Sequence, residues 1–354
     1  MLAGAVILLF LLPATAACLS YFAGTIFGRS PRRLAPRTPS HSLAILIPAH
    51  DEESTLPRTL TSIAAADYPA ELVTVHVVAD HCSDETEAVA RRFGAECSSR
   101  RGSPQQGKGY ALAFGLAEVL AARPDAVLIL DADCRIDPNL LRRLDGELAT
   151  GAVVVQTALI SECDPSNPAS IVAAIGSVID NRSASIGDRL GRSVPLRGTG
   201  MLLTRGILGL FPWAAFGLAE DAEYGALLRS HGVPIRFAPE AVTCEAPERE
   251  SDFLGQRRRW RASLGVSQPG RWFASKPLIL FHLLPTTLAV ALTADAVLAA
   301  WLGLLIAFTA LTYADAMLGV GVRWPGFRSF WLVGRLAIVA LGRPRETRWL
   351  RTPR

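Results

Sequence analysis

Three short apolar runs, each followed at once by polar residues, set the pattern of the first half of the chain. They are residues 43–47, 72–79 and 126–130, which are rich in branched side chains. Runs of this length and composition are typical of buried strands. The segments 84–93 and 110–120 have the apolar spacing and the end residues of helices. Alternating strands and helices predict an α/β domain with a mostly parallel sheet.

Two aspartates one residue apart, Asp131 and Asp133, end the third apolar run. Side chains at positions i and i+2 of an extended chain point the same way, so both carboxylates are expected at one point on the carboxyl edge of the sheet. Open α/β sheets bind their ligands at that edge. Paired carboxylate oxygens suit Mg²⁺ or Mn²⁺ bridging phosphates, and a polar turn without a metal is the alternative.

Two further segments carry residues suited to a phosphorylated substrate. Gly107-Lys-Gly109 opens the second helix, where backbone N–H groups and an ammonium favour a phosphate. An ordinary glycine turn with a solvated lysine would have the same sequence. Asp221 lies at the start of a later helix that ends near His231, and it is either an N-cap or a general base that takes a proton from an attacking hydroxyl.

A basic run, Gln256-Arg-Arg-Arg-Trp260, lies in a helix-prone stretch. Helical spacing places Gln256, Arg259 and Trp260 on one face, where Arg259 suits a diphosphate and Trp260 suits a sugar ring. A juxtamembrane basic cluster is the alternative. The other arginines of this region are expected to face solvent or anionic lipid headgroups: Arg257, Arg258 and Arg261.

Long apolar segments lie at both ends of the chain. Residues 1–28 carry no charged side chain and are long enough to cross a bilayer, which predicts an uncleaved anchor, with a cleaved signal peptide as the alternative. Residues 277–322 contain only two charged residues, Asp295 and Asp315, which predicts spans at about 277–294 and 297–316. Residues 327–341 predict an interfacial amphipathic helix, with a third C-terminal span as the alternative.

The predicted organisation therefore has membrane segments on both sides of one large domain. The basic residues that follow the first segment and precede the C-terminus place the domain on the cytoplasmic side of the inner or plasma membrane, in a multi-pass protein. The predicted parts are an N-terminal transmembrane anchor (1–28), a basic linker (29–41), a catalytic domain (42–275), two transmembrane helices (276–322) and an amphipathic, basic tail (323–354).

Composition agrees with a membrane protein and excludes several classes of function. The mean hydropathy of +0.29 is high for a soluble protein. The net charge of +4 is too small to favour nucleic-acid binding. The six cysteines form no CxxC pair or zinc spacing, which predicts free thiols in a reducing compartment. The absence of GxGxxG and P-loop motifs argues against dinucleotide and ATP-hydrolysing sites.

Seven short motifs occur in an order that resembles the membrane-bound family 2 glycosyltransferases, such as the cellulose, hyaluronan and poly-N-acetylglucosamine synthases. The resemblance covers about residues 42–275, and the order of the motifs makes it specific. The motifs are Pro48-Ala-His-Asp-Glu-Glu53, Val78-Ala-Asp80, Gly107-Lys-Gly109, Asp131-Ala-Asp133, Gly198-Thr-Gly200, Glu220-Asp221 and Gln256-Arg-Arg-Arg-Trp260.

This resemblance implies a GT-A fold, a nucleotide-sugar donor, favouring a UDP-sugar, and a divalent metal, Mg²⁺ or Mn²⁺. It implies that Asp221 is the general base of an inverting transfer. The residues implied on the donor side are Ala49, Glu52, Asp80, Lys108, Asp131 and Asp133, and the last two would also hold the metal. The residues implied on the acceptor and diphosphate side are Gly198, Thr199, Gly200, Glu220, Gln256, Arg259 and Trp260.

The expected function is transfer of a sugar to a glycan or lipid-linked acceptor in polysaccharide or glycolipid biosynthesis. The expected partners are the donor, the acceptor, membrane lipids and other subunits of a synthase or export system, but no nucleic acid. Two departures stand out: Asp51 replaces an asparagine that is frequent in relatives, and the predicted spans are fewer than in polymer-secreting synthases. The alternatives are a polyprenyl-phosphate sugar transferase, a non-catalytic nucleotide-sugar-binding subunit and, more remotely, a nucleotidyltransferase.

Overall fold

Two compact units make up the chain in the computed structural model, which describes residues 15–16, 18–29, 34, 37–246, 249–267, 296–323 and 325–341. We term them the sheet unit, residues 31–160 and 187–245, and the helical unit, residues 1–30, 161–186 and 246–354. Of the predicted domain 42–275, residues 161–186 and the described residues between 246 and 267 belong to the helical unit.

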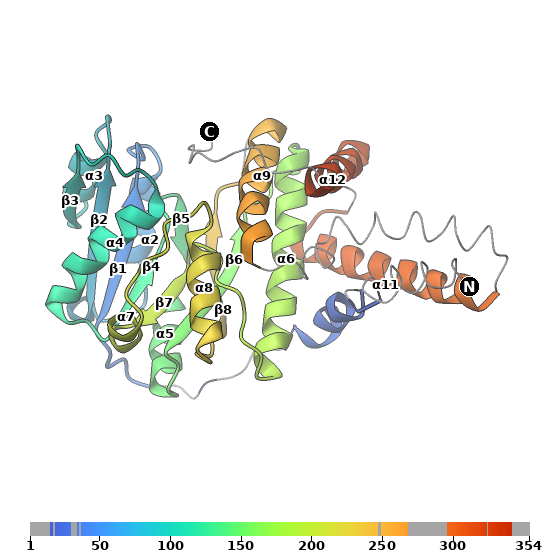
Figure 1. Ribbon diagram of the computed structural model, residues 1–354, viewed down its shortest axis with the longest axis horizontal. Coiled ribbons are helices and arrows are strands. Elements are labelled where there is room, and N and C mark those ends of the chain that lie inside the picture. The colour runs from blue at the N-terminus through green and yellow to red at the C-terminus, as the bar shows by residue number, and fades with distance from the viewer. Residues whose placement is uncertain are drawn as a thin grey trace. The chain divides into compact units, whose positions relative to one another are not determined.

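An eight-stranded sheet in the order β3-β2-β1-β4-β7-β6-β8-β5 forms the centre of the sheet unit (Figure 1). Strands β3, β2, β1 and β4 are parallel, as the alternating pattern predicts. Strand β7 runs antiparallel to β4 and β6, and β5 runs antiparallel to β8. The strands are β1 Leu43–Ala49, β2 Val73–Asp80, β3 Glu96–Arg100, β4 Ala126–Ile129, β5 Cys134–Ile136, β6 Val154–Ser161, β7 Met201–Thr204 and β8 Arg236–Cys244.

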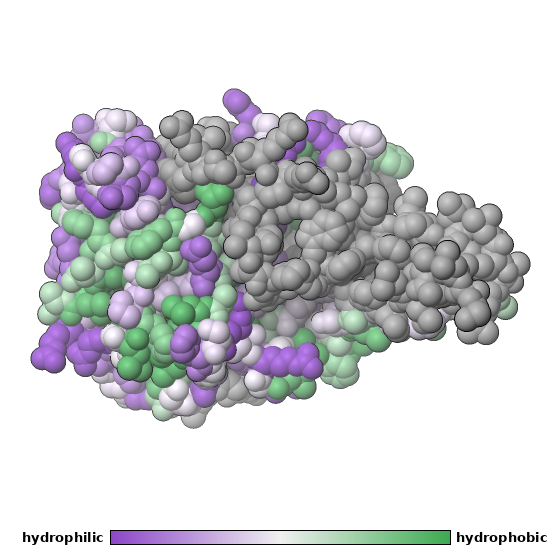
Figure 2. Space-filling view, in the orientation of Figure 1, coloured by the Kyte–Doolittle hydropathy of each residue, from purple (hydrophilic) through white to green (hydrophobic). Residues whose placement is uncertain are grey.

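Helices cover both faces of this sheet. Helix α4 packs on β1 and β2, α2 packs on β5 and α3, and α5 packs on β8. The helices are α2 Leu56–Ala64, α3 Thr86–Arg92, α4 Lys108–Val119, α5 Leu140–Ala149, α7 Arg205–Leu210 and α8 Glu220–Ser230, with short 3₁₀ turns at Ala70–Leu72 and Leu120–Ala122. On the face seen in Figure 2, hydrophobic residues gather over α4 and α7.

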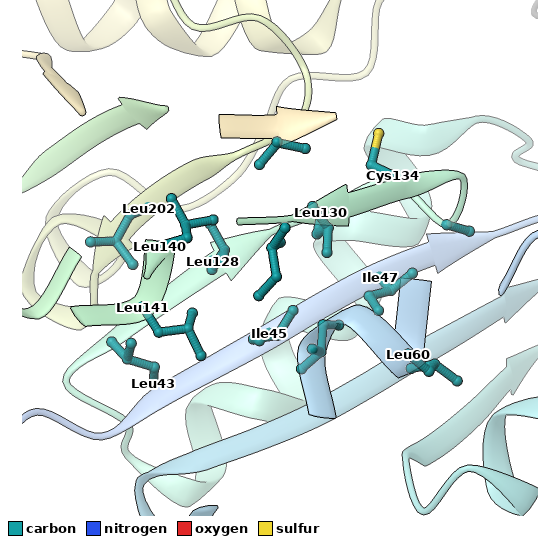
Figure 3. Packing of buried hydrophobic residues seen from close by; sticks show 14 of the residues in the cluster. Leu43, Ile45, Ile47, Leu60, Leu128, Leu130, Cys134, Leu140, Leu141 and Leu202 are labelled. Carbon is teal, nitrogen blue, oxygen red and sulfur yellow. The ribbon is translucent and has the colours of Figure 1, made fainter. Parts of the chain in front are cut away.

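The core of the sheet unit follows from the alternation of side chains along β1. Leu43, Ile45 and Ile47 point to one face, where they pack with leucines of α2 and α5 (Figure 3). Leu46 points to the other face, where it meets Gly115 of α4. Because β1 is buried on both faces, its apolar run is nearly continuous, and this explains why the sequence pattern predicts it well.

The helical unit contains α6 Pro168–Arg189, α9 Glu250–Ser267, α11 Ala296–Val320 and α12 Gly326–Leu341, together with a short apolar helix, Cys18–Phe27. Leu332 and Leu336 of α12 are buried against Phe253 of α9 and small residues of α6. Arg335 of α12 donates to Glu250 of α9 at 3.2 Å. The helix predicted at 327–341 is therefore present, and one of its faces is packed on protein.

One arginine in the basic run does not face outward as the sequence suggested. The guanidinium of Arg257 lies over the ring of Phe253, 4.9 Å from its centroid. Burial lowers the pKa of Arg257 to about 10, and the nearby carboxylate of Asp180 opposes this shift. The prediction that Arg257 faces solvent or headgroups is wrong because α9 turns this side chain towards α6, whereas Arg258 is exposed as expected.

Helix α11 is the one candidate membrane span within the described ranges. Its segment Ala299–Val320 is long and apolar enough to cross a bilayer, with a mean hydropathy of 1.6. The span predicted at 297–316 falls largely in this helix, whereas residues 1–14 and the span predicted at 277–294 lie outside the described residues. Asp315 in α11 pairs with Arg29 and, at 3.1 Å, with Arg182 of α6, so this carboxylate is neutralised within the helical unit.

Candidate active site

Three parallel strands end at the same edge of the sheet and place three of the predicted site residues there. Strands β1 and β2 are in register so that Ala49 lies opposite Ala79, one residue before Asp80. Strand β4 pairs with the other side of β1 and runs directly into Asp131. The topology therefore gathers the predicted donor-side segments at the carboxyl edge, as expected for an open α/β sheet.

A partly buried cluster of one lysine and three carboxylates lies at this edge. The Nζ atom of Lys108 is 2.5 Å from Oδ1 of Asp131 and 3.7 Å from Oε1 of Glu220. It also donates to the carbonyl of Gly198 at 2.8 Å. The negative charge of Asp221 also raises the pKa of Lys108. We term these four side chains the Lys108 cluster; it joins α4, the end of β4 and the start of α8.

Asp221 does not cap helix α8. The helix begins at Glu220 and its N-cap position is Ala219, so Asp221 is the second residue of the helix. Its Oδ1 atom accepts the N–H of Ala222 at 2.8 Å, and Oδ2 lies 3.6 Å from the place that a Cβ atom would take at Gly198. This position faces the 197–200 loop, and it excludes the N-cap alternative that the sequence left open.

The loop Gly198 to Gly200 is held in place by two buried polar side chains. The hydroxyl of Thr199 accepts the N–H of Asp131 at 2.9 Å. Gln156 of β6, which is fully buried, donates to the carbonyl of Thr199 at 2.9 Å and accepts the N–H of Arg197 at 2.8 Å. Gly200 has a φ of +63° and a Cβ atom there would lie 2.0 Å from Oγ1 of Thr157, so this position requires glycine.

The segment before α8 lies against the first turn of α4. A Cβ atom at Gly109 would lie 2.3 Å from the carbonyl oxygen of Ala215, so glycine at this position permits the close approach. The ring of Phe216 stacks on Tyr110 with 4.4 Å between centroids, and Phe216 keeps 43% of its surface exposed. Lys108 directly precedes Gly109 and Tyr110, and the Glu220-Asp221 pair follows soon after Phe216. The contact between the two segments therefore helps to fix Lys108 relative to this pair.

Burial controls the protonation of this cluster. Burial raises the pKa of Glu220 to about 7, against the attraction of Lys108, and the neighbouring Asp221 raises it further. Burial also raises the pKa of Asp221, while Lys108 opposes that rise. For Lys108 burial alone would lower the pKa, but Asp131 and Glu220 raise it above its usual range, so this ammonium stays charged. A carboxylate with a pKa near neutrality is suited to accept a proton during catalysis.

We expect the unusual pKa of Glu220 to appear in the pH dependence of folding. Between the ordinary value of 4.5 and about 7 the folded state holds a proton at Glu220 that the unfolded state has lost, so stability falls as pH rises through this window. Glu220→Gln should remove part of this fall. Thermal unfolding of the metal-free protein across the window measures it, with Glu71→Gln, an exposed site, as the control. A difference between wild type and Glu220→Gln that is independent of pH would contradict the expectation.

Asp131 and Asp133 form a group that fits a hard divalent cation. Together with Cys134 they bring one ligand atom each within 4.8 Å of one another. Carboxylate oxygens are the ligands that Mg²⁺ and Mn²⁺ prefer. Cys134 is less suited, because burial raises the pKa of its thiol well above the ordinary value, and the thiol donates to Oδ1 of Asp133 at 3.3 Å. The two aspartates are therefore the residues that would hold the metal.

Asp80, the predicted contact to the nucleoside, is fixed by two neighbours that the sequence did not point to. Nε of Arg100 lies 2.8 Å and Nδ1 of His81 lies 2.7 Å from Oδ1 of Asp80. All three are buried or half-buried, and the register of β2 with β3 sets Asp80 opposite Arg100. Arg100 could not be found by pattern because β3 is a short, polar edge strand.

Carboxylates of the loop after β1 hold this loop in place by hydrogen bonds. Oδ1 of Asp51 accepts the N–H of Ser83 at 2.6 Å and the N–H of Asp84 at 3.3 Å, and these bonds lower the pKa of Asp51. Glu52 is buried, and its Oε2 accepts the hydroxyl of Thr55 at 2.5 Å. Ala49 is also buried. Asp51 thus joins the loops after β1 and β2.

The Gln256 to Trp260 run lies in α9 of the helical unit, as predicted from its helical spacing. Gln256 is half-buried, and the side chains of Arg259 and Trp260 lie outside the described part of the chain. Their predicted contact with a diphosphate and an acceptor therefore stays a prediction. All six cysteines are free thiols, which agrees with the expectation from their spacing.

The architecture is similar to that of a solved transferase. The mannosyltransferase PcManGT from Pyrobaculum calidifontis, solved in complex with GDP-Man and Mn²⁺, matches with a TM-score of 0.58 and 16% identity. The match covers 90% of this chain and 98% of that chain. Together with the sheet topology, this likeness defines a GT-A-like α/β fold.

The chain belongs to the family described as glycosyltransferase like family 2, whose model matches residues 39–263. It is 28% identical over 231 residues to the probable glycosyltransferase YdaM of Bacillus subtilis, which is 62% of this chain and 54% of that protein. It is 28% identical over 136 residues to the beta-monoglucosyldiacylglycerol synthase of Synechocystis sp., which is 36% of this chain and 28% of that protein. The chain thus spans about half the length, or less, of these curated relatives. Membership of this family agrees with the predicted enzyme class, a glycosyltransferase.

Proposed function

We propose that this protein is a membrane-bound, metal-dependent, inverting glycosyltransferase that moves a sugar from a nucleotide-sugar donor to a glycan or lipid-linked acceptor. The observation that carries the proposal is the Lys108 cluster, where three carboxylates and an ammonium from distant segments meet at the carboxyl edge of the sheet. A protein that only bound a nucleotide sugar would have no use for two buried carboxylates with raised pKa values beside the phosphate-binding residues.

The donor is proposed to lie along the ends of β1, β2 and β4. Asp80, held by Arg100 and His81, would accept hydrogen bonds from the nucleoside. Lys108 at the start of α4 would bind the diphosphate, assisted by the N–H groups of the first helical turn. Asp131 and Asp133 would hold the divalent cation, which when bound offsets the negative charge that develops on the leaving diphosphate.

Asp221 is proposed as the general base. The acceptor oxygen forms a bond to the anomeric carbon while the bond from that carbon to the diphosphate oxygen breaks, and the electron pair leaves with the nucleoside diphosphate. The acceptor's proton goes to the carboxylate of Asp221. Its position beside Gly198 supports this role, because Gly198 to Gly200 would then line the acceptor side. Gln256, Arg259 and Trp260 are proposed to hold the diphosphate and the acceptor end.

Attachment to a membrane is supported by the surfaces of α11 and α12. Leu304, Leu311 and Leu318 recur every seventh residue on α11 and expose 56%, 53% and 74% of their surface. On α12, Phe327 and Trp331 expose 82% and 70%, opposite the buried leucines of that helix. Exposed apolar side chains in such numbers fit a lipid environment, with aromatic residues at its border.

A lipid acceptor is the second candidate, and the chemistry differs only at the acceptor. The likeness to a relative named for glucosyldiacylglycerol synthesis favours it, as does the exposed Phe216, which lies four residues before Glu220 and stacks on Tyr110 of α4. A polyprenyl phosphate and a diacylglycerol are the two acceptors to compare with an oligosaccharide.

A donor and acceptor screen with the purified full chain tests the proposal. UDP- and GDP-sugars are offered with Mn²⁺ or Mg²⁺, together with oligosaccharide, diacylglycerol and polyprenyl phosphate acceptors, and products are sized. Transfer to one acceptor, dependent on metal, is the expected result. Binding of nucleotide sugar with neither hydrolysis nor transfer under any of these conditions would favour the non-catalytic subunit and overturn the proposal.

A further inference from the structure

The ammonium of Lys108 is bound by the same aspartate that would hold the metal. Its Nζ atom is 2.5 Å from Asp131, 2.8 Å from the carbonyl of Gly198 and 3.7 Å from Glu220, and it would lie 3.6 Å from a Cβ atom at Gly198, where Asp221 also approaches. Only 18% of the lysine side chain is exposed. The lysine is therefore a mostly buried counter-ion of three carboxylates, of which Asp131 keeps 35% of its side chain exposed.

Position 108 holds a lysine in a chain whose basic residues are almost all arginines. Of the 36 basic residues, only Lys108 and Lys276 are lysines and the others are arginines. An ammonium is a compact point charge with three donors, whereas a guanidinium is a planar fork suited to paired oxygens. Two oxygens lie within hydrogen-bond distance of Nζ of Lys108, one of Asp131 and one of Gly198, and a carboxylate oxygen of Glu220 lies 3.7 Å away. These oxygens come from three segments and suit a compact ammonium.

We propose that Lys108 is a built-in cation that holds Asp131 until a nucleotide diphosphate arrives, so that the divalent metal binds weakly alone and tightly together with the nucleotide. This inference rests on the proposed function. A divalent ion on Asp131 would bring two cations to one half-buried carboxylate, where their repulsion is screened less than in bulk water. A diphosphate offers Lys108 new oxygen partners and adds negative charge, which releases Asp131 to the metal.

Two consequences follow for binding. The nucleotide and the metal strengthen each other's binding by the same factor, because coupling between two ligands is reciprocal. In the metal-free protein the ammonium of Lys108 offsets part of the negative charge of the cluster, so its carboxylates do not repel one another without a nearby cation. Lys108 thus makes the nucleotide and the metal bind together, and no separate regulatory site is needed.

Titration of the nucleotide-free full chain with Mn²⁺, by calorimetry, measures the competition directly. Lys108→Met should bind Mn²⁺ at least about tenfold more tightly than wild type, about 1.4 kcal/mol, and UDP or GDP should tighten Mn²⁺ binding less than in wild type. Arg101→Met removes a positive charge from an exposed side chain of the same unit and controls for long-range charge. It should leave Mn²⁺ affinity within a factor of two, since exposed charges are screened. Unchanged or weaker Mn²⁺ binding by a folded Lys108→Met variant would overturn the inference.

A measurement on the unmodified protein covers the possibility that Lys108→Met fails to fold. Because the chain has only two lysines, an amine-reactive reagent followed by peptide mass spectrometry reads Lys108 separately from Lys276. Mn²⁺ without nucleotide should raise the labelling of Lys108 relative to Lys276, since the metal displaces the ammonium from Asp131. Constant labelling at saturating Mn²⁺ would contradict the competition.

The same titrations separate this inference from the function on which it rests. If wild type binds Mn²⁺ but neither UDP nor GDP, the proposed function fails and the inference fails with it. If nucleotide and Mn²⁺ bind together, but Lys108→Met does not gain Mn²⁺ affinity when the nucleotide is absent, only the inference fails.

Discussion

Replacing Asp221 by asparagine is expected to lower the turnover number by roughly two to four orders of magnitude, the usual contribution of a positioned general base. Asparagine keeps the size and the hydrogen-bonding oxygen of the side chain, so the bond from the N–H of Ala222 can persist. What is lost is the ability to take the acceptor's proton. Single-turnover transfer, with a saturating donor, measures the loss.

Donor binding should largely survive this substitution. The proposed contacts to nucleoside and diphosphate come from Asp80, Lys108 and the Asp131-Asp133 pair, and none of them requires the carboxylate of Asp221. Calorimetric binding of a donor that is not turned over should therefore change by less than about tenfold, or 1.4 kcal/mol. Asp67→Asn, at an exposed aspartate that pairs with Arg142, is the matched control and should keep full activity. Unchanged turnover in Asp221→Asn would refute the base assignment.

The pH profile adds an independent check on the same residue. Burial raises the pKa of Asp221 and Lys108 opposes the rise, so removing the lysine charge should raise that pKa further. A base must be deprotonated to act, and therefore the acidic limb of the kcat/KM profile is expected to move to higher pH in Lys108→Met. A limb that moves to lower pH would show that the titrating group does not feel Lys108.

The hydrophobic pattern predicted the strands that are buried on both faces and missed those that are not. Strands β1, β2 and β4 lie within one or two residues of the predicted runs, because a parallel strand in the centre of a sheet is apolar along its length. Strand β3 at the edge of the sheet is Glu-Cys-Ser-Ser-Arg and has no such run, and β5 is only three residues long. The antiparallel pairing of β7 also leaves no local trace, since it depends on where the chain returns after α6.

The candidate site shows the same division between local and distant information. Short motifs were enough to pick out the carboxylates and Lys108 as candidate site residues. The same motifs also showed the resemblance to a family. That one ammonium contacts Asp131 and approaches Glu220 could not, because these residues meet only after β4, α4 and α8 have packed. Gln156 gave one weak signal, a polar residue within an apolar strand, and Arg100 gave none; the roles of both depend on strand register.

Replacing Asp133 by asparagine is expected to remove most of the metal dependence. A bound divalent cation contributes several kcal/mol to a phosphate-leaving reaction, so kcat/KM should fall by roughly two to three orders of magnitude. Mn²⁺ affinity in the presence of UDP or GDP should fall in parallel, because an amide oxygen is a weaker ligand than a carboxylate. Calorimetric titration and a metal-dependence curve of the transfer rate measure the two effects.

The neighbouring thiol offers the matched control for this substitution. Cys134 lies in the same group of ligand atoms, yet burial raises the pKa of its thiol, so the thiolate needed for coordination is scarce at neutral pH. Cys134→Ser should therefore keep Mn²⁺ affinity within a few-fold of wild type, a change well under the 1.4 kcal/mol of a tenfold loss. Equal losses in Asp133→Asn and Cys134→Ser would mean that the thiol is a ligand, and normal Mn²⁺ binding by Asp133→Asn would place the metal elsewhere.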